Sequence, residues 1–217
     1  MNNLDHIVVA AKTVEQGASW IQNKLGVDIP PGGVHKTMGT HNHLMQLGGD
    51  AYLEVVAINP EGEIPDRPRW FNLDDRLMRA SIEQEPRLIT WMINTSNIEN
   101  LASNADFDFG QIQTLSRDQL SWKVALTSDG RLLGGGLIPH GIEWQSKPHP
   151  SRSMADRQCR LKSLNLFHNR PQWLRNQLVS IKVNHLILIH TLEQDQSPFL
   201  SAEIECPNGL VTLGSSF

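Results

Sequence analysis

The stretch that decides the fold covers residues 4–60 and reads LDHIVVAAKTVEQGASWIQNKLGVDIPPGGVHKTMGTHNHLMQLGGDAYLEVVAINP. Its hydrophobic pattern changes from strand-like to helix-like and back again. Residues 4–11 are apolar and rich in β-branched side chains, which predicts a strand. Thr13 then stands where an N-cap hydroxyl would, and Gly26 stands where helices commonly end. We therefore expect a helix between Thr13 and Gly26.

The second part of this stretch predicts three more strands. The Pro-Pro-Gly-Gly sequence at residues 30–33 is expected to break the chain. Strand-like segments follow at residues 34–37, 41–47 and 52–58. The unit therefore has the predicted order β-α-β-β-β.

Four short motifs follow one another along the chain. They are MGTHN at residues 38–42, AYLE at 51–54, PRWF at 68–71 and LSW at 120–122. With the β-α-β-β-β unit, they resemble the bacterial glyoxalase-like domain family of the vicinal oxygen chelate superfamily, which includes glyoxalase I and extradiol dioxygenases. The resemblance runs along the whole chain and is strongest before residue 125. It implies an α+β fold, in which repeated β-α-β-β-β modules form curved mixed or antiparallel sheets with helices on the outer face.

The element order repeats along the chain, which predicts three modules. We expect a first module at residues 1–60, a connector with a short helix at 61–87, a second module at 88–150 and a divergent third module at 160–217. Further expected elements are helices at residues 73–82, 98–105 and 171–178, and strands at 120–126, 137–145, 161–168, 181–192, 199–206 and 210–213. The third module should be structural and pack in the same globular unit, because Ser163 stands where the first module has His6.

The composition excludes several classes of protein. A net charge of −4 gives no electrostatic reason to expect nucleic acid or an anionic membrane as partner. No apolar run approaches the length of a membrane helix, and we expect a cytoplasmic protein. Cys159 and Cys206 are expected to be buried thiols, with one isolated disulfide as the alternative. No G-x-S-x-G or H-E-x-x-H sequence supports serine-hydrolase or zincin chemistry.

Two ionisable residues lie in apolar strands of the first module. Because side chains alternate along a strand, His6 is expected to project with Leu4 and Val8, and Glu54 with Tyr52. Burying either charge is costly unless it is paired, protonated or bound to a metal. The sequence leaves open a plain His6–Glu54 ion pair and a metal site.

The resemblance implies metal ligands in the first and last strand of each module, at His6, Glu54, Thr90 and Glu143. The metal would be a divalent ion (Zn, Ni, Mn or Fe), with no organic cofactor. Thr90 is a poor ligand, so a histidine could replace it, water could complete a facial triad, or the metal has been lost. The candidate replacements are His41, His43 and His140. Glu143 could instead face solvent.

A substrate pocket is predicted from the histidines and tryptophans. In one strand, His41 and His43 share one face and Asn42 the other, and the sequence does not say which face lines a pocket. We consider His41 and Glu143 as catalytic candidates. Trp70 would act in a lid, and three tryptophans of the second module would form an aromatic wall if they share a face. These are Trp91, Trp122 and Trp144.

Two functions follow as hypotheses. The first is a metal-dependent lyase, isomerase or dioxygenase that acts on a small substrate with two neighbouring oxygens. The second is a metal-free binding protein that sequesters an aromatic or hydrophobic compound. In either case the expected partner is a small molecule, and modules could pair within one chain or across a homodimer.

Overall fold

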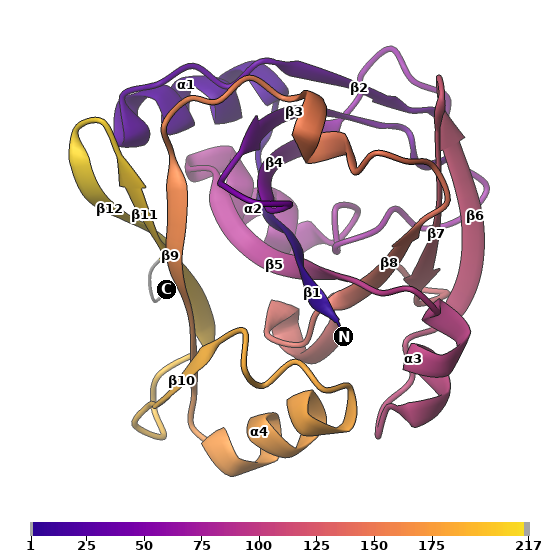
Figure 1. The fold of residues 1–217 in the computed structure, drawn as a ribbon, viewed down its shortest axis with the longest axis vertical. Coiled ribbons are helices and arrows are strands. Elements are labelled where there is room, and N and C mark those ends of the chain that lie inside the picture. The colour runs from indigo at the N-terminus through magenta and orange to yellow at the C-terminus, as the bar shows by residue number, and fades with distance from the viewer. Residues whose placement is uncertain (1, 215–217) are drawn as a thin grey trace.

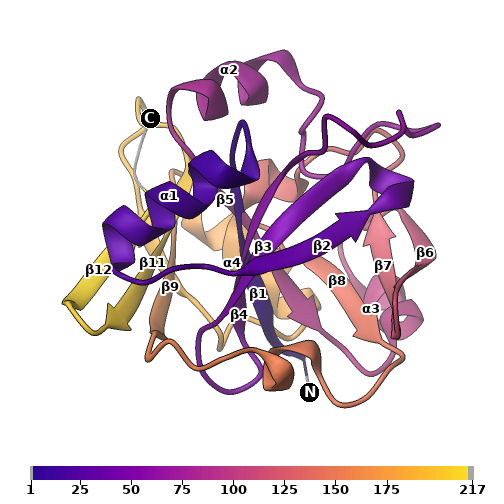
Figure 2. The same cartoon turned by 90° about the horizontal axis from the view of Figure 1, so that it is seen from above.

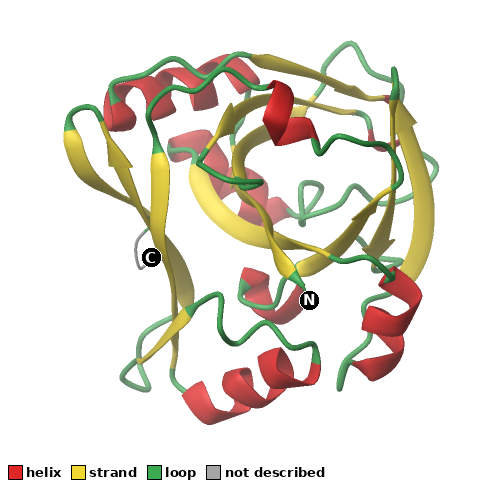
Figure 3. Ribbon diagram, in the orientation of Figure 1, coloured by secondary structure: helices red, strands yellow, loops and turns green. Residues whose placement is uncertain are grey.

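The computed structural model describes residues 2–214 and confirms the α+β fold with repeated β-α-β-β-β units (Figure 1). Residues 1 and 215–217, at the ends of the first and third predicted modules, lie outside the described residues. Eight strands form one curved sheet in the order β2-β3-β4-β1-β5-β8-β7-β6, and four form a second sheet in the order β10-β9-β11-β12. In Figure 3, α1 and α3 lie on the outer face of the curved sheet, and α4 packs against β9 and β10 of the second sheet.

The first unit follows the predicted order. It consists of β1 (Asn3–Ala10), α1 (Val14–Leu25), β2 (Pro31–His35), β3 (Thr40–Gln46) and β4 (Tyr52–Ile58), with a 3-10 turn at Lys36–Met38. Helix α1 begins where Thr13 Oγ1 accepts a hydrogen bond from the Gln16 N–H, 3.1 Å away. It ends at Gly26, which has a left-handed φ of 73°. Thr13 and Gly26 therefore act as predicted.

Strand β2 differs from its prediction. We expected a break at residues 30–33 and a strand at 34–37, but the strand begins at Pro31 and ends at His35. Strand β2 lies at an edge of the eight-stranded sheet, where a proline removes no hydrogen bond that the sheet needs. The two glycines that follow Pro31 are therefore part of the sheet.

The second unit repeats the plan after the connector helix α2 (Arg76–Gln84). It consists of β5 (Arg87–Asn94), α3 (Ile98–Asn104), β6 (Gln111–Arg117), β7 (Leu120–Leu126) and β8 (His140–Trp144), with 3-10 turns at Leu133–Gly136 and Pro150–Ser153. Strand β6 was not predicted, because its sequence is mostly polar. Strands β1 and β5 pair in antiparallel fashion and join the two units at the centre of the sheet.

The eight-stranded sheet curves until its two edge strands, β2 and β6, come into contact (Figures 1 and 2). The result is a barrel with two faces. Val8, Val56, Trp122 and other inward-facing side chains form one apolar cluster. Outward-facing side chains such as Ile7 belong to a second cluster, under α1 and the four-stranded sheet. The barrel interior is the place where side chains from both units meet.

The third unit packs on the outside of the barrel. It consists of β9 (Arg160–His168), α4 (Pro171–Ser180), β10 (Leu188–Thr191), β11 (Phe199–Cys206) and β12 (Gly209–Leu213). The strand predicted at residues 181–192 is wrong in extent, because Ile181 and Val183 are buried in the irregular segment after α4 and only Leu188–Thr191 pair as a strand. Cys159 and Cys206 are both buried free thiols.

Within residues 2–214, none of the helices combines the length and the apolar character that crossing a membrane would require.

Candidate functional site

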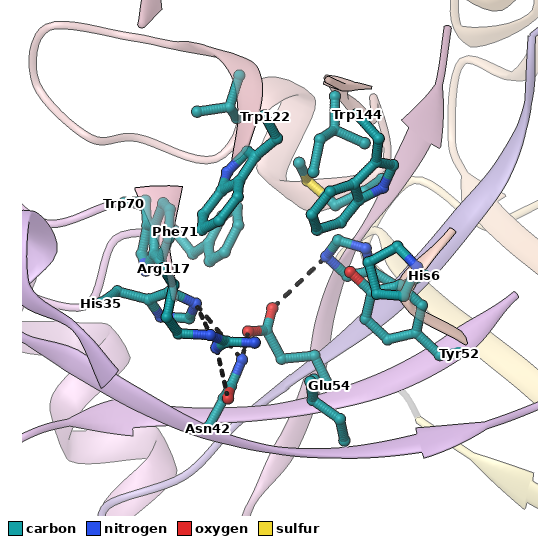
Figure 4. Close-up of a pocket in the computed structure, with 15 residues that line it drawn as sticks. His6, His35, Asn42, Tyr52, Glu54, Trp70, Phe71, Arg117, Trp122 and Trp144 are labelled. Carbon is teal, nitrogen blue, oxygen red and sulfur yellow. Dashed lines mark hydrogen bonds and ion pairs between the residues drawn. The ribbon is translucent and has the colours of Figure 1, made fainter. Parts of the chain in front are cut away.

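A cavity lies inside the barrel, between the two units (Figure 4). The space in it that is open to the centre of a water molecule is about 40 Å³, against roughly 10–15 Å³ that one water needs. It is lined by His6, His35, Asn42, Leu44, Tyr52, Glu54, Trp70, Phe71, Met92, Arg117, Trp122, Val124, Ile142, Trp144 and Pro150. The cavity therefore suits a small ligand.

The polar end of the cavity is built on β1 and β4, which run parallel. His6 Nε2 lies 3.5 Å from Glu54 Oε2, and His6 Nδ1 lies 2.6 Å from Asp5 Oδ1. All three side chains are buried. The ring of Tyr52 stacks on that of His6, with ring centroids 4.4 Å apart. Figure 4 shows Glu54 and His6 pointing toward each other across the cavity.

A β-bulge brings Asp5 and His6 together although they are neighbours in one strand. The pairing of β1 with β5 shifts by one residue between Leu4 and His6, so Asp5 is the extra residue. A bulge interrupts the alternation of side chains and re-aims them. Consequently Leu4 packs with the outer cluster that contains Ile7, and not beside His6 as the alternation predicted.

The buried charges hold one another in their ionised forms. Burial would raise the pKa of Asp5, but hydrogen bonds from His149 and His6 lower it to about 2. Burial would lower the pKa of His6, but the hydrogen bonds to Asp5 and Glu54 raise it to about 9. Burial would likewise raise the pKa of Glu54, and the hydrogen bond and charge of His6 lower it to about 2. Near neutral pH, His6 is a cation between two carboxylates.

Asp5 connects this charged group to the outside of the barrel. Its Oδ2 accepts hydrogen bonds from Trp144 Nε1 at 2.8 Å and from His149 Nε2 at 3.0 Å. His149 Nδ1 accepts the backbone N–H of Ser151, which leaves Nε2 to carry the proton. His149 and Trp144 also line a separate, open depression on the surface. A chain of one ion pair and two hydrogen bonds therefore leads from Glu54 through His6 and Asp5 to His149 in that depression.

The other end of the cavity carries amide and guanidinium groups. Asn42 Nδ2 donates to Glu54 Oε1 at 2.6 Å, and Asn42 Oδ1 accepts the Gly33 N–H at 2.9 Å. Arg117 reaches in from β6, with Nη1 3.4 Å from Asn42 Oδ1 and 3.5 Å from His35 Nε2. Burial lowers the pKa of His35 to about 4, so this ring is neutral. Arg117 therefore has only neutral close neighbours among these groups.

Aromatic rings form the remaining wall. The ring centroids of Trp122 and Trp144 lie 5.3 Å apart, and Trp70 stacks on Phe71 at 5.3 Å. The buried indole N–H of Trp70 has no acceptor among residues 2–214. Such walls exclude water and favour a ligand with an apolar or planar part.

Comparison with known proteins places this chain in a family. The family model described as a glyoxalase-like domain matches residues 4–181. The chain belongs to the glyoxalase-like domain family. The resemblance to the glyoxalase-like domain family that the sequence predicted is thereby confirmed. Strands β10, β11 and β12 of the third unit lie beyond the matched range.

Solved structures resemble this glyoxalase-like protein at low sequence identity. A hypothetical protein from Staphylococcus aureus is 11% identical, with a TM-score of 0.59 over 98% of this chain and 84% of that one. Methylmalonyl-CoA epimerase from Mycobacterium tuberculosis is 12% identical, with a TM-score of 0.42 over 69% of this chain and 91% of that one. A mutant 4-hydroxymandelate synthase from Streptomyces coelicolor is 10% identical, with a TM-score of 0.44 over 97% of this chain and 61% of that one. Of these three, the staphylococcal protein alone shows a shared fold. No curated protein matches this chain.

Several predicted site residues of the glyoxalase-like protein lie outside the cavity. Glu143 is on the opposite face of β8 from Trp144, and its Oε2 accepts the N–H of Ile98 at the start of α3. His41 lines a different depression, beside Thr13. The reason in both cases is strand alternation: Trp144 and Asn42 take the inward positions, and their neighbours face outward.

Three more candidates are also displaced from the cavity. His43 faces outward like His41, and its Nδ1 bonds the carbonyl of Ile29 at 2.7 Å. Trp91 is buried in the outer cluster, so it does not share a face with Trp122 and Trp144. Thr90 is buried, and its hydroxyl donates to the carbonyl of Gly136. The predicted residues that do line the cavity are His6, Asn42, Glu54, Trp70, Trp122 and Trp144.

The donor set does not fit the divalent metal that the family resemblance implies. A catalytic metal site normally has three protein ligands, and His6 Nε2 and Glu54 Oε2 provide two. In the second unit, the cavity positions on β5 and β8 hold Met92, Ile142 and Trp144. No three His, Cys, Asp or Glu side chains gather as a metal-binding group within the part of the chain that the structure describes. The guanidinium of Arg117 also lies in the same cavity.

Sequence reasoning missed Asp5, His149, His35 and Arg117. The bulge at Asp5 has no sequence signature, and His149 lies in a loop. His35 was within a predicted strand but was not considered as a site residue. A signal for Arg117 exists once β6 is known to be a strand, because Arg117 lies two residues after the buried Leu115 and so shares its inward face.

Proposed function

We propose that this glyoxalase-like protein is an enzyme that moves a proton on a small, oxygen-bearing substrate, as an isomerase, without a resident metal. The observation that carries the proposal is the pair of Glu54 Oε2 and His6 Nε2, 3.5 Å apart at the end of an aromatic-walled cavity. One group is a carboxylate and the other a proton donor, and each is held in place by a further residue.

Glu54 is the proposed base. Asn42 holds Oε1, which leaves Oε2 to face the substrate. In the free protein the hydrogen bond from His6 keeps the pKa of Glu54 low. When a substrate oxygen accepts the His6 proton instead, that hydrogen bond is lost and the basicity of Glu54 rises. Substrate binding thus converts an ion pair into a base and a separate proton donor.

His6 is the proposed proton donor to the substrate oxygen. Removing a proton from carbon next to a carbonyl leaves negative charge on the oxygen, and a donor aimed at that charge lowers the barrier. Asp5 fixes the ring through Nδ1, so Nε2 points into the cavity. The proton taken by Glu54 is then returned to carbon, either at the same position or at its neighbour.

Solvent exchange tests this function. The protein would be incubated in D₂O with a panel of small 2-oxo acids and 2-hydroxy ketones, and loss of C–H signals followed by NMR. We expect exchange that falls by about 100-fold or more in Glu54→Gln and His6→Gln. Glu143→Gln is the matched control, because this glutamate faces away from the cavity. Exchange that survives in Glu54→Gln would contradict the proposal, and exchange lost on treatment with a chelator would assign it to a metal.

The second candidate function is a metal-free binding protein. It is favoured by the aromatic wall of Trp70, Phe71, Trp122 and Trp144 around a small cavity. Ligands that quench tryptophan fluorescence without any C–H exchange would support this function over the first.

A further inference from the structure

The cavity contains a guanidinium, that of Arg117, which forms no direct ion pair within the described chain. Arg117 is half-buried, and no carboxylate lies within 4.0 Å of its guanidinium among residues 2–214. Its two close neighbours, Asn42 and His35, are neutral and lie at 3.4 and 3.5 Å, which is long for a hydrogen bond. A guanidinium is a strong donor to planar anions and is costly to bury without one.

The fold makes room for this side chain. Arg117 comes from β6 and crosses the contact between the two edge strands of the barrel. At Gly33 on β2, an added Cβ would lie 2.8 Å from Arg117 Cδ and 2.9 Å from Nε. At Gly32, an added Cβ would lie 2.3 Å from Asn42 Oδ1. Neither glycine has a left-handed φ, so these positions need glycine for space and not for backbone conformation.

The surroundings complete a place for an anion. Trp70 lines the same cavity beside His35, with ring centroids 4.9 Å apart, and its buried indole N–H lacks an acceptor within the described chain. Among residues 2–214, Glu54 makes no ion pair with Arg117, and its two oxygens receive Asn42 and His6. Figure 4 shows Arg117, Asn42 and His35 together on one side of Glu54, with His6 on the other side and Trp122 and Trp144 across the cavity.

We propose that Arg117 is the carboxylate-binding residue of this cavity, so that the substrate is a small organic acid whose apolar or planar part lies against the tryptophans. The inference rests on the proposed function in one respect: the acid bound at Arg117 would present its remaining oxygen and carbon atoms to His6 and Glu54. Binding itself needs no catalysis, so it can be tested separately.

The test compares acids with their neutral amides of nearly the same shape. The probes are acetate, lactate and phenylacetate, each paired with its amide, and binding is followed by tryptophan fluorescence and checked by calorimetry. We expect each bound acid to exceed its amide in affinity by about tenfold or more. Arg117→Gln should remove that preference while leaving amide binding unchanged, and Arg117→Lys should retain part of it, because lysine keeps the charge and loses the planar fork.

Two further variants make the result independent of one side chain. Gly33→Ala should weaken acid binding because the methyl group displaces Arg117 from its path. Arg131→Gln is the matched control, since this arginine pairs with Asp129 at the surface, and it should keep the full preference for acids. Circular dichroism would verify that each variant is folded.

Each outcome decides the matter. The anion site would be overturned by equal affinity for acid and amide or by binding of neither probe. It would also be overturned if Arg117→Gln weakened the binding of acid and amide equally. Such an equal loss would show that Arg117 acts by orienting Asn42. Glu54→Gln separates the two proposals. Acid preference that persists in Glu54→Gln, with exchange unaffected by that substitution, would retain the carboxylate site and reject the proton-transfer function. Exchange that depends on Glu54, without acid preference, would do the reverse.

Discussion

The two units of the barrel have the same order of elements but contribute different chemistry to the cavity. The first unit supplies the ionisable and amide groups near its centre, namely His6, Asn42 and Glu54. The second supplies apolar and aromatic wall residues such as Met92 and Trp122, together with one cation. A duplicated backbone therefore does not imply a duplicated site.

The difference lies in which residue takes each inward position. On β4, Glu54 faces inward with Tyr52, whereas on β8 the inward residues are Ile142 and Trp144 and the glutamate between them faces outward. A symmetric ligand set would need a carboxylate inward on both strands. The asymmetry suits a ligand with one reactive polar end and one apolar end.

The largest expected effect comes from breaking the polar unit at Asp5. Asp5→Ala removes the acceptor for His6, His149 and Trp144 and leaves the buried imidazolium of His6 with one carboxylate, Glu54, in place of two. We expect the free energy of unfolding to fall by about 3–5 kcal/mol, as measured by urea denaturation. Asp50→Ala is the control, because Asp50 pairs with Arg152 at the surface, and it should cost less than about 1 kcal/mol. Equal losses would show that the buried network does not stabilise the fold.

The second prediction concerns pH. The pKa of His6 is raised from 6.5 to about 9 in the folded protein, so its contribution to stability is fully present below pH 6.5 and is lost as pH rises through 9. The loss should be roughly 3 kcal/mol. Asp5 and Glu54 have lowered pKa values of about 2, so their contributions are present above their unfolded values and are lost as the pH falls toward 2.

Denaturation curves at a series of pH values would measure this profile. The alkaline decline should disappear in His6→Gln. The free energy of unfolding of the wild type should fall steeply in acid. Burial also lowers the pKa values of His35 and His140 to about 4. Below pH 6.5 the unfolded chain therefore binds protons at these histidines more readily than the folded protein, which destabilises the fold. An alkaline slope that persists in His6→Gln would belong to another group.

The smallest expected effect separates two tryptophans of the aromatic wall. Trp144→Phe and Trp122→Phe remove similar ring volume, but only the Trp144 indole donates to Asp5, at 2.8 Å. The difference between the two losses of unfolding free energy should be about 1.5–3 kcal/mol, as for a hydrogen bond to a charged group. Equal losses would mean that Trp144 contributes only as part of the apolar wall.

The sequence predicted the elements best where the hydrophobic periodicity was clear and turn or capping residues marked both ends. The strands at Tyr52–Ile58, Leu120–Leu126 and Phe199–Cys206 have the predicted bounds. Strand β6 was missed because an edge strand with a largely polar sequence lacks the alternation that identifies half-buried strands. The helix bounded by Thr13 and Gly26 was predicted from its caps.

The sequence identified site residues only where the pattern within a single strand was sufficient to identify them. His6 and Glu54 were singled out because ionisable residues in apolar strands need an explanation. Which face of β3 turns inward depends on its pairing with β4, and the sequence left that open. Arg117 enters the cavity only because two distant edge strands meet, and Asp5 only because the strand bulges. Both are properties of the assembled barrel.

The contact between β2 and β6 gives the cavity a particular place in the folding of the chain. His35 and Arg117 are 82 residues apart in sequence, and contacts of such long range carry a high cost in loop-closure entropy and tend to form late. A cavity that draws on both edge strands is complete only after that last closure. A ligand held between Arg117 and Glu54 would then connect β6 to the first unit across the contact between β2 and β6. Its binding energy would raise the free energy needed to separate these two strands.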